Sequence, residues 1–366
     1  MTILFAGGGS LGPVTPLLAT AKTLRAKHPH IHCVWMGTPD GPERALVDAA
    51  GIPFSSLPIL KWPRYVSRDW FSFPWRWWHV RCEARRLLET VRPDAVVSAG
   101  GFTATPIIQQ AAKMGVPCFV HQLDLEPGLA NRLVAPLCVS VTTSFEYEVR
   151  PFGERVCDEP MPTPVRYVLE GLPSRANAAR AFGLDPAKSI VCIYGGGQGA
   201  QALNEMIEQT RETWLTFTQV IHLTGRGKAE HLHRVVRPGY VVRAVLDAQE
   251  MREAHAAADV EIIRGGMGSL SEVAALKKAA VVVPMPDSHQ ETNARAFEEQ
   301  GGVLVFDQCS PTCAEDVLSS ARLLLRDHKE CKAMGTRAHR FFPTDDGTAF
   351  AERILKHLSR SYANAV

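Results

Sequence analysis

The sequence predicts an α/β protein built from two Rossmann-like domains, each a doubly wound parallel sheet, with a cleft between them. Short apolar runs alternate with helical patterns along nearly the whole chain. A proline-rich break at 157–175 interrupts this rhythm, and two glycine turns recur at matching places on each side of the break. The length of 366 residues also makes two domains the default expectation.

The first half of the chain reads as alternating strands and helices from its amino terminus. The apolar runs are short and continuous, as expected for strands that are buried on both faces of a parallel sheet. The segments between them are long enough for the helical crossovers that parallel strands require. The predicted strands are 2–8, 32–37, 93–101 and 117–122, and the predicted helices are 14–28, 41–51 and 106–115.

The second half repeats this design. Residues 190–209 read as strand, glycine turn and helix, like residues 3–25, and residues 261–284 echo residues 96–120. Ligands of open α/β sheets bind at the carboxyl ends of strands, where such turns meet helix amino termini. Backbone N–H groups there can approach an anion, and the usual ligand is a diphosphate. Four such turns are therefore predicted to line one cleft.

Composition excludes several classes of protein. A net charge of +2 argues against a general polyanion binder. The nine cysteines include no C-x-x-C pair, so we expect no zinc site, no disulfide framework and no metal or other cofactor. The chain has no signal-like amino terminus and no apolar run of the roughly 18–20 residues that span a bilayer. We therefore expect a cytosolic or peripheral protein.

Several motifs together resemble the MurG family, whose members transfer N-acetylglucosamine from UDP to a lipid-linked muramyl-peptide. The run "GGGQGAQALN" is similar to the family's G-G-S-Q-G-A-x-x-L-N and is the most specific of them. The resemblance extends over nearly the whole chain. The similar segments are 7–16, 98–106, 121–135, 163–166, 195–204, 264–275 and 287–294.

The resemblance implies a GT-B fold and a metal-independent, inverting transfer. The implied N-terminal acceptor and membrane-associating domain covers 1–163 plus 346–366, including a returning helix at 347–360. The implied UDP-sugar domain covers 164–345. The implied reaction joins UDP-N-acetylglucosamine to a polyprenyl-diphosphate-linked muramyl-pentapeptide, the lipid I to lipid II step of peptidoglycan synthesis. Such an enzyme serves cell wall biogenesis, cell shape and cell division. The absence of an Asp-x-Asp motif agrees with a reaction that needs no metal.

The same resemblance implies the substrate-binding residues. Glu272 would accept hydrogen bonds from the ribose diol, although a capping box with Ser269 explains the same spacing. Gln290 and Asn293 would bind the sugar hydroxyls, and the backbone of Ala248 would contact the uracil. The full predicted set is Ser10, Leu11, Gly12, Asp124, Arg166, Gly196, Gly197, Gln198, Ala248, Gly266, Met267, Gly268, Ser269, Leu270, Ser271, Glu272, Gln290 and Asn293.

The chain departs from the family pattern where catalysis is expected. Pro13 stands in place of a loop histidine, and a proline can neither accept a proton nor donate its N–H. The acceptor hydroxyl must still lose a proton. Asp124, which replaces a family asparagine, is the predicted catalytic base. His121 is the second catalytic candidate, although a structural role suits it better, and Glu126 is the third.

Residues 61–86 combine five of the seven tryptophans with seven basic and two acidic residues. Because the family's acceptor stays in the bilayer, this segment is predicted to contact an anionic membrane surface, partly as a helix from Pro74. That places the enzyme peripherally on the cytoplasmic face of the plasma membrane. The alternatives are core aromatics with solvated arginines, or nucleic-acid stacking, which lacks an accompanying fold. The predicted membrane residues are Trp70, Phe71, Phe73, Trp75, Arg76 and Trp78.

Three other functions remain open at this point. A UDP-sugar transferase acting on another lipid, such as a diacylglycerol, would use the same motifs. A sugar-nucleotide epimerase of the same fold would not need the membrane segment. A non-catalytic sugar-nucleotide sensor is suggested by Pro13 and by Gly197, which replaces a family serine.

Overall fold

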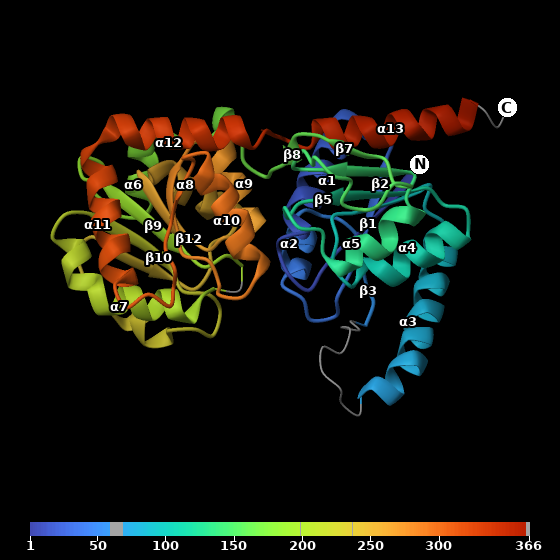
Figure 1. The fold of residues 1–366 in the computed structure, drawn as a ribbon, viewed down its shortest axis with the longest axis horizontal. Coiled ribbons are helices and arrows are strands. Elements are labelled where there is room, and N and C mark those ends of the chain that lie inside the picture. Colours follow the sequence, from blue (N-terminus) through green and yellow to red (C-terminus); the bar gives the residue numbers. More distant parts are fainter. Residues whose placement is uncertain (59–68, 198, 236, 364–366) are drawn as a thin grey trace. The chain divides into compact units, whose positions relative to one another are not determined.

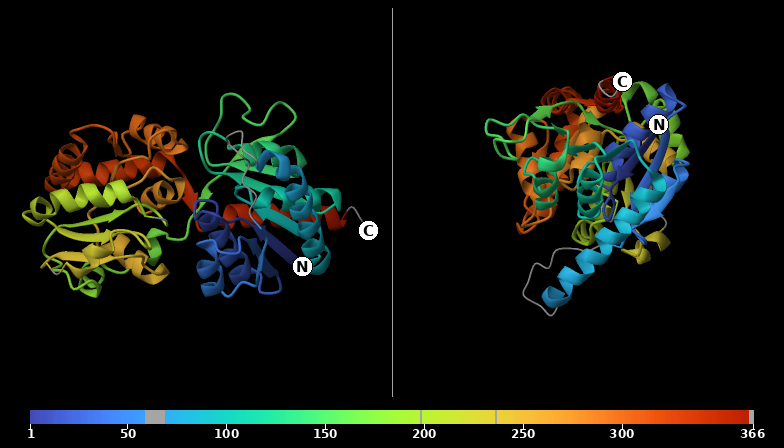
Figure 2. Two further views of the ribbon diagram at one scale, coloured as in Figure 1. Left: turned by 90° about the horizontal axis from the view of Figure 1, so that it is seen from below. Right: turned by 90° about the vertical axis from the view of Figure 1, so that its right-hand side faces the viewer.

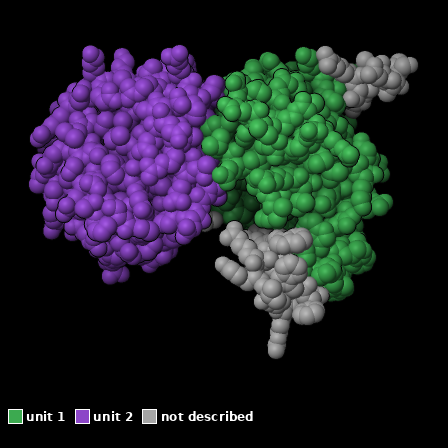
Figure 3. Space-filling model, in the orientation of Figure 1, with its two compact units in different colours: residues 1–166, 345–366 green, residues 167–344 purple. Residues whose placement is uncertain are grey.

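The computed structural model describes residues 1–58, 69–197, 199–235 and 237–363 (Figure 1, Figure 2). The chain divides into two compact units (Figure 3). Unit 1 comprises Met1–Arg166 and Asp345–Val366, and unit 2 comprises Tyr167–Thr344. Each unit contains one large parallel sheet, so the predicted α/β class with two doubly wound sheets is confirmed.

Unit 1 is built on a seven-stranded sheet with the order β3-β2-β1-β4-β5-β6-β7, in which every pair is parallel. The order reverses direction between β1 and β4, so right-handed crossovers place helices on both faces. Its strands are β1 Thr2–Ala6, β2 His32–Gly37, β3 Phe54–Ser56, β4 Ala95–Ser98, β5 Cys118–Gln122, β6 Ser140–Thr143 and β7 Asp158–Pro160.

Helices cover this sheet through an apolar core. Leu4, Val96 and Val120, on three neighbouring strands, pack with the buried face of the fourth helix at Ile107 and Ile108. The helices of unit 1 are α1 Val14–Lys27, α2 Glu43–Ala49, α3 Asp69–Val91, α4 Ala104–Lys113, α5 Leu129–Val134, the 3-10 turn η1 Ala135–Leu137 and α13 Thr348–Ala363.

The carboxyl-terminal helix α13 belongs to unit 1, where it packs against α1 (Figure 1). Its buried face carries Phe350, Ile354 and Leu358, which recur at helical spacing. Thr23 on α1 donates a hydrogen bond of 2.6 Å to the carbonyl of Asp346, directly before this helix. A short sheet that pairs β15 Thr344–Asp345 with β8 Thr163–Pro164 precedes it.

Unit 2 repeats the architecture with a six-stranded parallel sheet of order β11-β10-β9-β12-β13-β14. Its strands are β9 Ile190–Tyr194, β10 Gln219–Leu223, β11 Tyr240–Arg243, β12 Val260–Ile263, β13 Ala279–Val282 and β14 Leu304–Val305. Its helices are η2 Leu169–Gly171, α6 Arg175–Ala181, α7 Gln201–Leu215, η3 Glu230–Arg234, α8 Ala248–Ala257, α9 Met267–Ala275, α10 His289–Glu299, α11 Cys313–Arg326 and α12 His328–Phe341.

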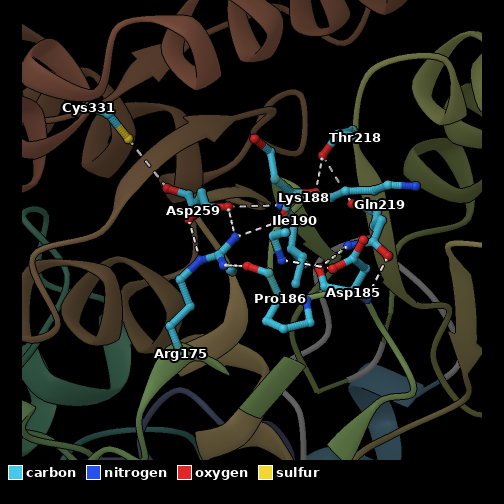
Figure 4. Close-up of polar contacts among 12 residues, drawn as sticks. Arg175, Asp185, Pro186, Lys188, Ile190, Thr218, Gln219, Asp259 and Cys331 are labelled. Carbon is cyan, nitrogen blue, oxygen red and sulfur yellow. Dashed lines mark hydrogen bonds and ion pairs between the residues drawn. The ribbon is translucent and has the colours of Figure 1, made fainter. Parts of the chain in front are cut away.

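A polar cluster fastens helices to the amino-terminal edge of this sheet (Figure 4). Arg175 on α6 donates from Nε and Nη2 to the two carboxylate oxygens of Asp259, at 2.7 and 2.6 Å. Asp259 also accepts from the N–H of Ile190, at the start of β9, and its carbonyl accepts from the thiol of Cys331 on α12. The glycine turns after β9 and β12 lie at the opposite, carboxyl-terminal edge of the sheet.

The long helix α3 differs from the predicted one. It begins at Asp69 rather than at Pro74, so Pro74 lies inside the helix, where it removes one backbone hydrogen bond. The amino-terminal end of α3 projects from the rest of unit 1 (Figure 2). Within the described part of the chain, no helix is both long and apolar enough to span a bilayer.

Candidate functional site

The turn between β9 and α7 requires glycine at two positions. A Cβ atom at Gly199, whose φ is +66°, would lie 2.3 Å from the carbonyl oxygen of Thr224. A Cβ at Gly195 would lie 2.4 Å from the backbone nitrogen of Ala200. Between them, Gly196 and Gly197 are exposed, while the predicted ligand Gln198 lies outside the described residues. The turn thus exposes backbone without side chains, at Gly196 and Gly197, before the start of α7.

The turn between β12 and α9 forms a second open helix terminus. Gly266 is the N-cap residue of α9 and supplies no side-chain cap. Its carbonyl accepts from the N–H groups of Ser269 and Leu270, so the N–H groups of Met267 and Gly268 form the open end of the helix. Met267, Ser269 and Leu270 are buried in the first turn. Ser271 donates its hydroxyl back to the carbonyl of Met267, so it is used inside the helix.

Glu272 lies one turn further along α9 and is 5% exposed. The capping box with Ser269 is not formed, because α9 begins at Met267, two residues before Ser269, and Ser269 therefore lies inside the helix. The Oε2 atom of Glu272 lies 3.5 Å from Nε2 of His255, which is fully buried. A carboxylate is therefore held at the carboxyl edge of the sheet, beside a helix terminus that favours anions.

The start of α10 lies directly beside the β12–α9 turn. A Cβ at Gly265 would lie 2.3 Å from the carbonyl oxygen of Gln290. The side-chain oxygen of Gln290 accepts from the N–H of Met285 at 3.1 Å, and Asn293 is fully buried one turn later. The structure therefore brings Gln290 and Asn293 into the neighbourhood of the Gly266–Glu272 segment.

Arg264, which no site prediction included, ties the β12–α9 turn to the segment after β13 and to Gln308. Its Nη1 donates to the carbonyls of Val283 and Pro284 at 2.8 and 3.0 Å, and its Nη2 donates to Gln308 at 2.6 Å. Burial lowers the pKa of the guanidinium, and these three neutral oxygens offset the loss of water. Its position directly before Gly265 and Gly266 is the feature of the sequence that could have identified Arg264 as part of this site.

Two further predicted donor ligands lie elsewhere in the chain. Ala248 is exposed at the first position of α8, behind a capping box formed by Asp247 and Glu250. Arg166 is half-buried and is the last residue of the first segment of unit 1, whereas the residues above belong to unit 2.

In unit 1, the β1–α1 turn is held from below by Glu43, which sequence reasoning missed. This fully buried carboxylate accepts from the N–H of Gly9 at 3.1 Å and from both the N–H and the hydroxyl of Thr38 at 2.6 Å. Cβ atoms at Gly8 and Gly41 would lie 2.2 and 1.9 Å from Glu43 and Thr38. Gly41, two residues before Glu43, is the feature of the sequence that could have indicated this contact.

The rest of this turn carries the predicted residues Ser10, Leu11 and Gly12. Ser10 is exposed, and the carbonyl of Leu11 accepts the N–H groups that open α1, at 3.1 Å. Pro13 is the N-cap of α1. Its Cγ would lie 3.9 Å from a Cβ at Gly101, so the first two glycine turns lie side by side at the carboxyl edge of this sheet.

Asp124 lies half-buried in the loop after β5. The side-chain amide of Gln122 donates to the carbonyl of Asp124 at 2.7 Å, and the hydroxyl of Tyr147 donates to the carbonyl of Leu125 at 2.9 Å. Gln122 is held in turn by Asn131 at 2.6 Å. These bonds fix the loop backbone on which Asp124 lies.

His121 lies inside unit 1, with no exposed surface. Its Nδ1 is 2.9 Å from the hydroxyl of Thr142, and its Nε2 is 3.1 Å from the hydroxyl of Ser144. Burial lowers the pKa of this imidazole to about 3. Both ring nitrogens are engaged with hydroxyls, so the geometry suits a structural histidine and leaves Asp124 as the candidate base.

The aromatic residues of α3 divide between two faces. Trp75 and Trp78 are 66% and 58% exposed, and Arg76 between them is also exposed. Phe73 and Trp77 instead stack on each other and pack against the core of unit 1. The structure therefore removes Phe73 from the predicted outward face. The side chains of Trp70 and Phe71 lie outside the described residues.

Comparisons with known proteins agree with this arrangement. The family model for the glycosyltransferase family 28 N-terminal domain matches residues 3–143, and the model for the glycosyltransferase family 28 C-terminal domain matches residues 190–347. A UDP-N-acetylglucosamine--N-acetylmuramyl-(pentapeptide) pyrophosphoryl-undecaprenol N-acetylglucosamine transferase of a Nocardioides species is 35% identical, over 97% of this chain and 98% of the relative. A protein of the same name from Paenarthrobacter aurescens is 33% identical, over 98% and 97%.

Solved structures show the same fold. MurG from Acinetobacter baumannii matches with a TM-score of 0.68 and 23% identity, covering 97% of this chain and 99% of its own. A UDP-GlcNAc 2-epimerase from Neisseria meningitidis, bound to UDP-GlcNAc, matches with a TM-score of 0.68 and 13% identity, covering 97% and 100%. The predicted GT-B fold is confirmed, and at these identities the likeness concerns the fold alone.

Proposed function

The chain belongs to the MurG family within glycosyltransferase family 28, and we propose that it transfers N-acetylglucosamine from UDP-N-acetylglucosamine to a lipid-linked muramyl-pentapeptide. The observation that carries this proposal is the pairing of an uncapped helix amino terminus at Gly266 with the buried carboxylate of Glu272. A nucleoside diphosphate offers the matching groups, an anion followed by a cis-diol.

In the proposed donor complex, the diphosphate lies at the amino terminus of α9, where N–H groups and the helix dipole favour negative charge. Glu272 accepts hydrogen bonds from the ribose hydroxyls. Gln290 and Asn293 bind the sugar, and the backbone near Ala248 contacts the uracil. The bare β9–α7 turn at Gly196 and Gly197 supplies further N–H groups.

In the proposed reaction, the C4 hydroxyl of the acceptor sugar attacks the anomeric carbon from the face opposite UDP. The Asp124 carboxylate takes the hydroxyl proton as the new C–O bond forms. The bond from the anomeric carbon to the diphosphate oxygen breaks, and UDP leaves with the electron pair. The α9 terminus stabilises the negative charge that develops on UDP. A single displacement of this kind inverts the anomeric configuration.

We further propose that the enzyme works peripherally at the cytoplasmic face of the membrane, where its lipid-linked acceptor resides. The exposed Trp75 and Trp78 with Arg76 support this proposal. Tryptophan favours the headgroup boundary, and arginine is attracted to anionic lipid. We propose no nucleic-acid partner and no metal or other cofactor.

The test of the proposed function uses the purified full chain, UDP-N-acetylglucosamine and a short-chain lipid-linked muramyl-pentapeptide, with UDP release and product formation as readouts. The proposal expects UDP release that depends on this acceptor and yields the disaccharide product. Release only with a diacylglycerol would assign another lipid acceptor. Conversion of the sugar nucleotide without any acceptor would indicate an epimerase, and UDP binding without turnover would indicate a sensor.

A further inference from the structure

His255, on α8 of unit 2, is fully buried among ionisable side chains from three other elements. Its Nδ1 lies 2.8 Å from Oε1 of Glu261 on β12, and its Nε2 lies 3.5 Å from Oε2 of Glu272 on α9. The other oxygen of Glu261 accepts a hydrogen bond of 2.8 Å from the hydroxyl of Tyr194 on β9. A continuous chain of polar contacts thus runs from the strand interior to Glu272.

We propose that Tyr194, Glu261 and His255 form a buried relay that orients the Glu272 carboxylate for the nucleotide and couples donor affinity to the protonation of His255. This inference rests on the proposed function, in which Glu272 binds the ribose. The three residues do not touch the substrate, so they are positioning residues. They act by holding a proton between two carboxylates.

The charges around His255 favour its protonated form. Burial by itself lowers the pKa of this imidazole, but Glu261 and Glu272 raise it from 6.5 to about 9. Burial and Glu261 raise the pKa of the Tyr194 phenol well above 10, so that hydroxyl remains a donor. At neutral pH the imidazolium therefore lies between two carboxylates.

Other groups near the relay do not replace this cation. The rings of Tyr167 and Tyr194 lie 5.5 and 5.9 Å from the His255 ring, and a phenol cannot supply a positive charge. Lys278 donates to the carbonyl of Ala258 at 2.7 Å, and its charge interacts with the carboxylates of Glu261 and Asp259. Burial raises the pKa of the Cys192 thiol, and the charge of Glu261 raises it further. His255 is the cation that lies 3.5 Å from the Glu272 carboxylate.

Loss of the His255 proton would leave two buried carboxylates facing a neutral ring. Like charges in a low-dielectric interior repel strongly, so the Glu272 carboxylate would turn away from Glu261. That movement misplaces an acceptor for the ribose diol. The expected consequence is a donor affinity that is constant below about pH 9 and weakens above it, and the pKa that sets this limit belongs to His255.

The test measures UDP binding by calorimetry between pH 6 and pH 10 for the wild type, Glu261→Gln, His255→Gln and Glu272→Gln. Removing the Glu261 charge lowers the pKa of His255, so the pH at which affinity declines should move down by about 1–3 units. The uracil ring also loses a proton in alkali, but it does so equally with every protein. His255→Gln should raise the donor KM about tenfold with little change in kcat. The UDP affinity of this variant should no longer change with pH through the titration of residue 255.

Arg175→Gln serves as the control for a merely structural effect. It removes a partly exposed ion pair with Asp259 at the opposite edge of the same sheet, so it should lower the melting temperature and leave UDP affinity and its pH profile unchanged. An identical pH profile for the wild type and Glu261→Gln, with Glu272→Gln still impairing binding, would overturn the relay alone. Normal UDP binding by Glu272→Gln would overturn both the relay and the proposed donor site.

Discussion

The Nδ1 atom of His255 lies 2.8 Å from Oε1 of Glu261, and neither side chain reaches solvent. Native His255 keeps its proton up to about pH 9, whereas an unfolded histidine loses it near pH 6.5, so the native state binds more protons between these values. The resulting stability is complete below about pH 6.5 and is lost as pH rises through about 9. We expect the free energy of unfolding to fall over this window by on the order of 3 kcal/mol.

Urea denaturation at closely spaced pH values checks this expectation. Glu261→Gln removes the charge that holds the proton, so its unfolding free energy should depend less steeply on pH across the same window. A wild-type stability that stays level between pH 6.5 and 9 would contradict the assignment of a charged His255.

Replacing Asp124 by asparagine should abolish most of the turnover. The amide keeps the shape of the side chain but cannot accept the acceptor's proton, and general-base catalysis contributes roughly 10²–10⁴-fold. We expect kcat to fall by that factor with a donor KM close to the wild-type value. Steady-state kinetics with the lipid-linked acceptor measure this, and Glu126→Gln in the same loop is the matched comparison. A larger loss in Glu126→Gln would move the base to Glu126.

Glu43→Gln should disturb the β1–α1 turn from within. Glu43 accepts three hydrogen bonds with its two carboxylate oxygens, and a glutamine would direct an amide NH₂ at one of the donors. We expect a loss of about 1–3 kcal/mol in unfolding free energy and a raised acceptor KM. The control is Glu89→Gln, an exposed residue paired with Arg85, which should change stability by less than about 1 kcal/mol. Equal effects from the two variants would argue against the role assigned to Glu43.

Changing Trp75 and Trp78 to serine should weaken binding to vesicles that contain anionic lipid. Both side chains are mostly exposed on α3, so their loss removes interfacial area without opening the core. We expect a drop of about tenfold or more in a sedimentation assay, with UDP affinity unchanged. Leu323→Ser, at a leucine that is 66% exposed on α11, provides the control and should bind vesicles like the wild type. Undiminished binding by the tryptophan variant would exclude this face as the membrane contact.

Gly199→Ala tests the β9–α7 turn. Its φ of +66° disfavours any side chain, and the new methyl group would meet the Thr224 carbonyl. We expect a destabilisation of about 1–3 kcal/mol together with weaker UDP binding. Gly183→Ala is a useful comparison, because φ is +68° there but no atom lies within 4 Å of the added carbon. The difference between the two variants isolates the cost of the collision, which can be read from thermal melts.

Much of the architecture was accessible from the sequence because it depends on neighbouring residues. The predicted helix 14–28 corresponds to α1 at Val14–Lys27, and the glycine turns lie at the carboxyl ends of β1, β9 and β12, as their patterns indicate. Apolar runs specify buried strands, and glycine specifies a left-handed or crowded backbone wherever it occurs. Glu272 was selected through the resemblance to the MurG family, because local pattern alone equally allowed a capping box.

The tertiary structure decided what each side chain faces. His121 lies between Thr142 and Ser144, and Phe73 turns inward while Trp75 turns outward. The relay joins residues from β9, α8, β12 and α9, which no local pattern relates. The sequence by itself determined the fold class and the glycine turns, since short-range propensity and burial patterns encode them, and its motifs carried the resemblance to the family. Only packing between distant segments determined which charges lie within a few ångströms, and those distances set the proton affinities on which the site depends.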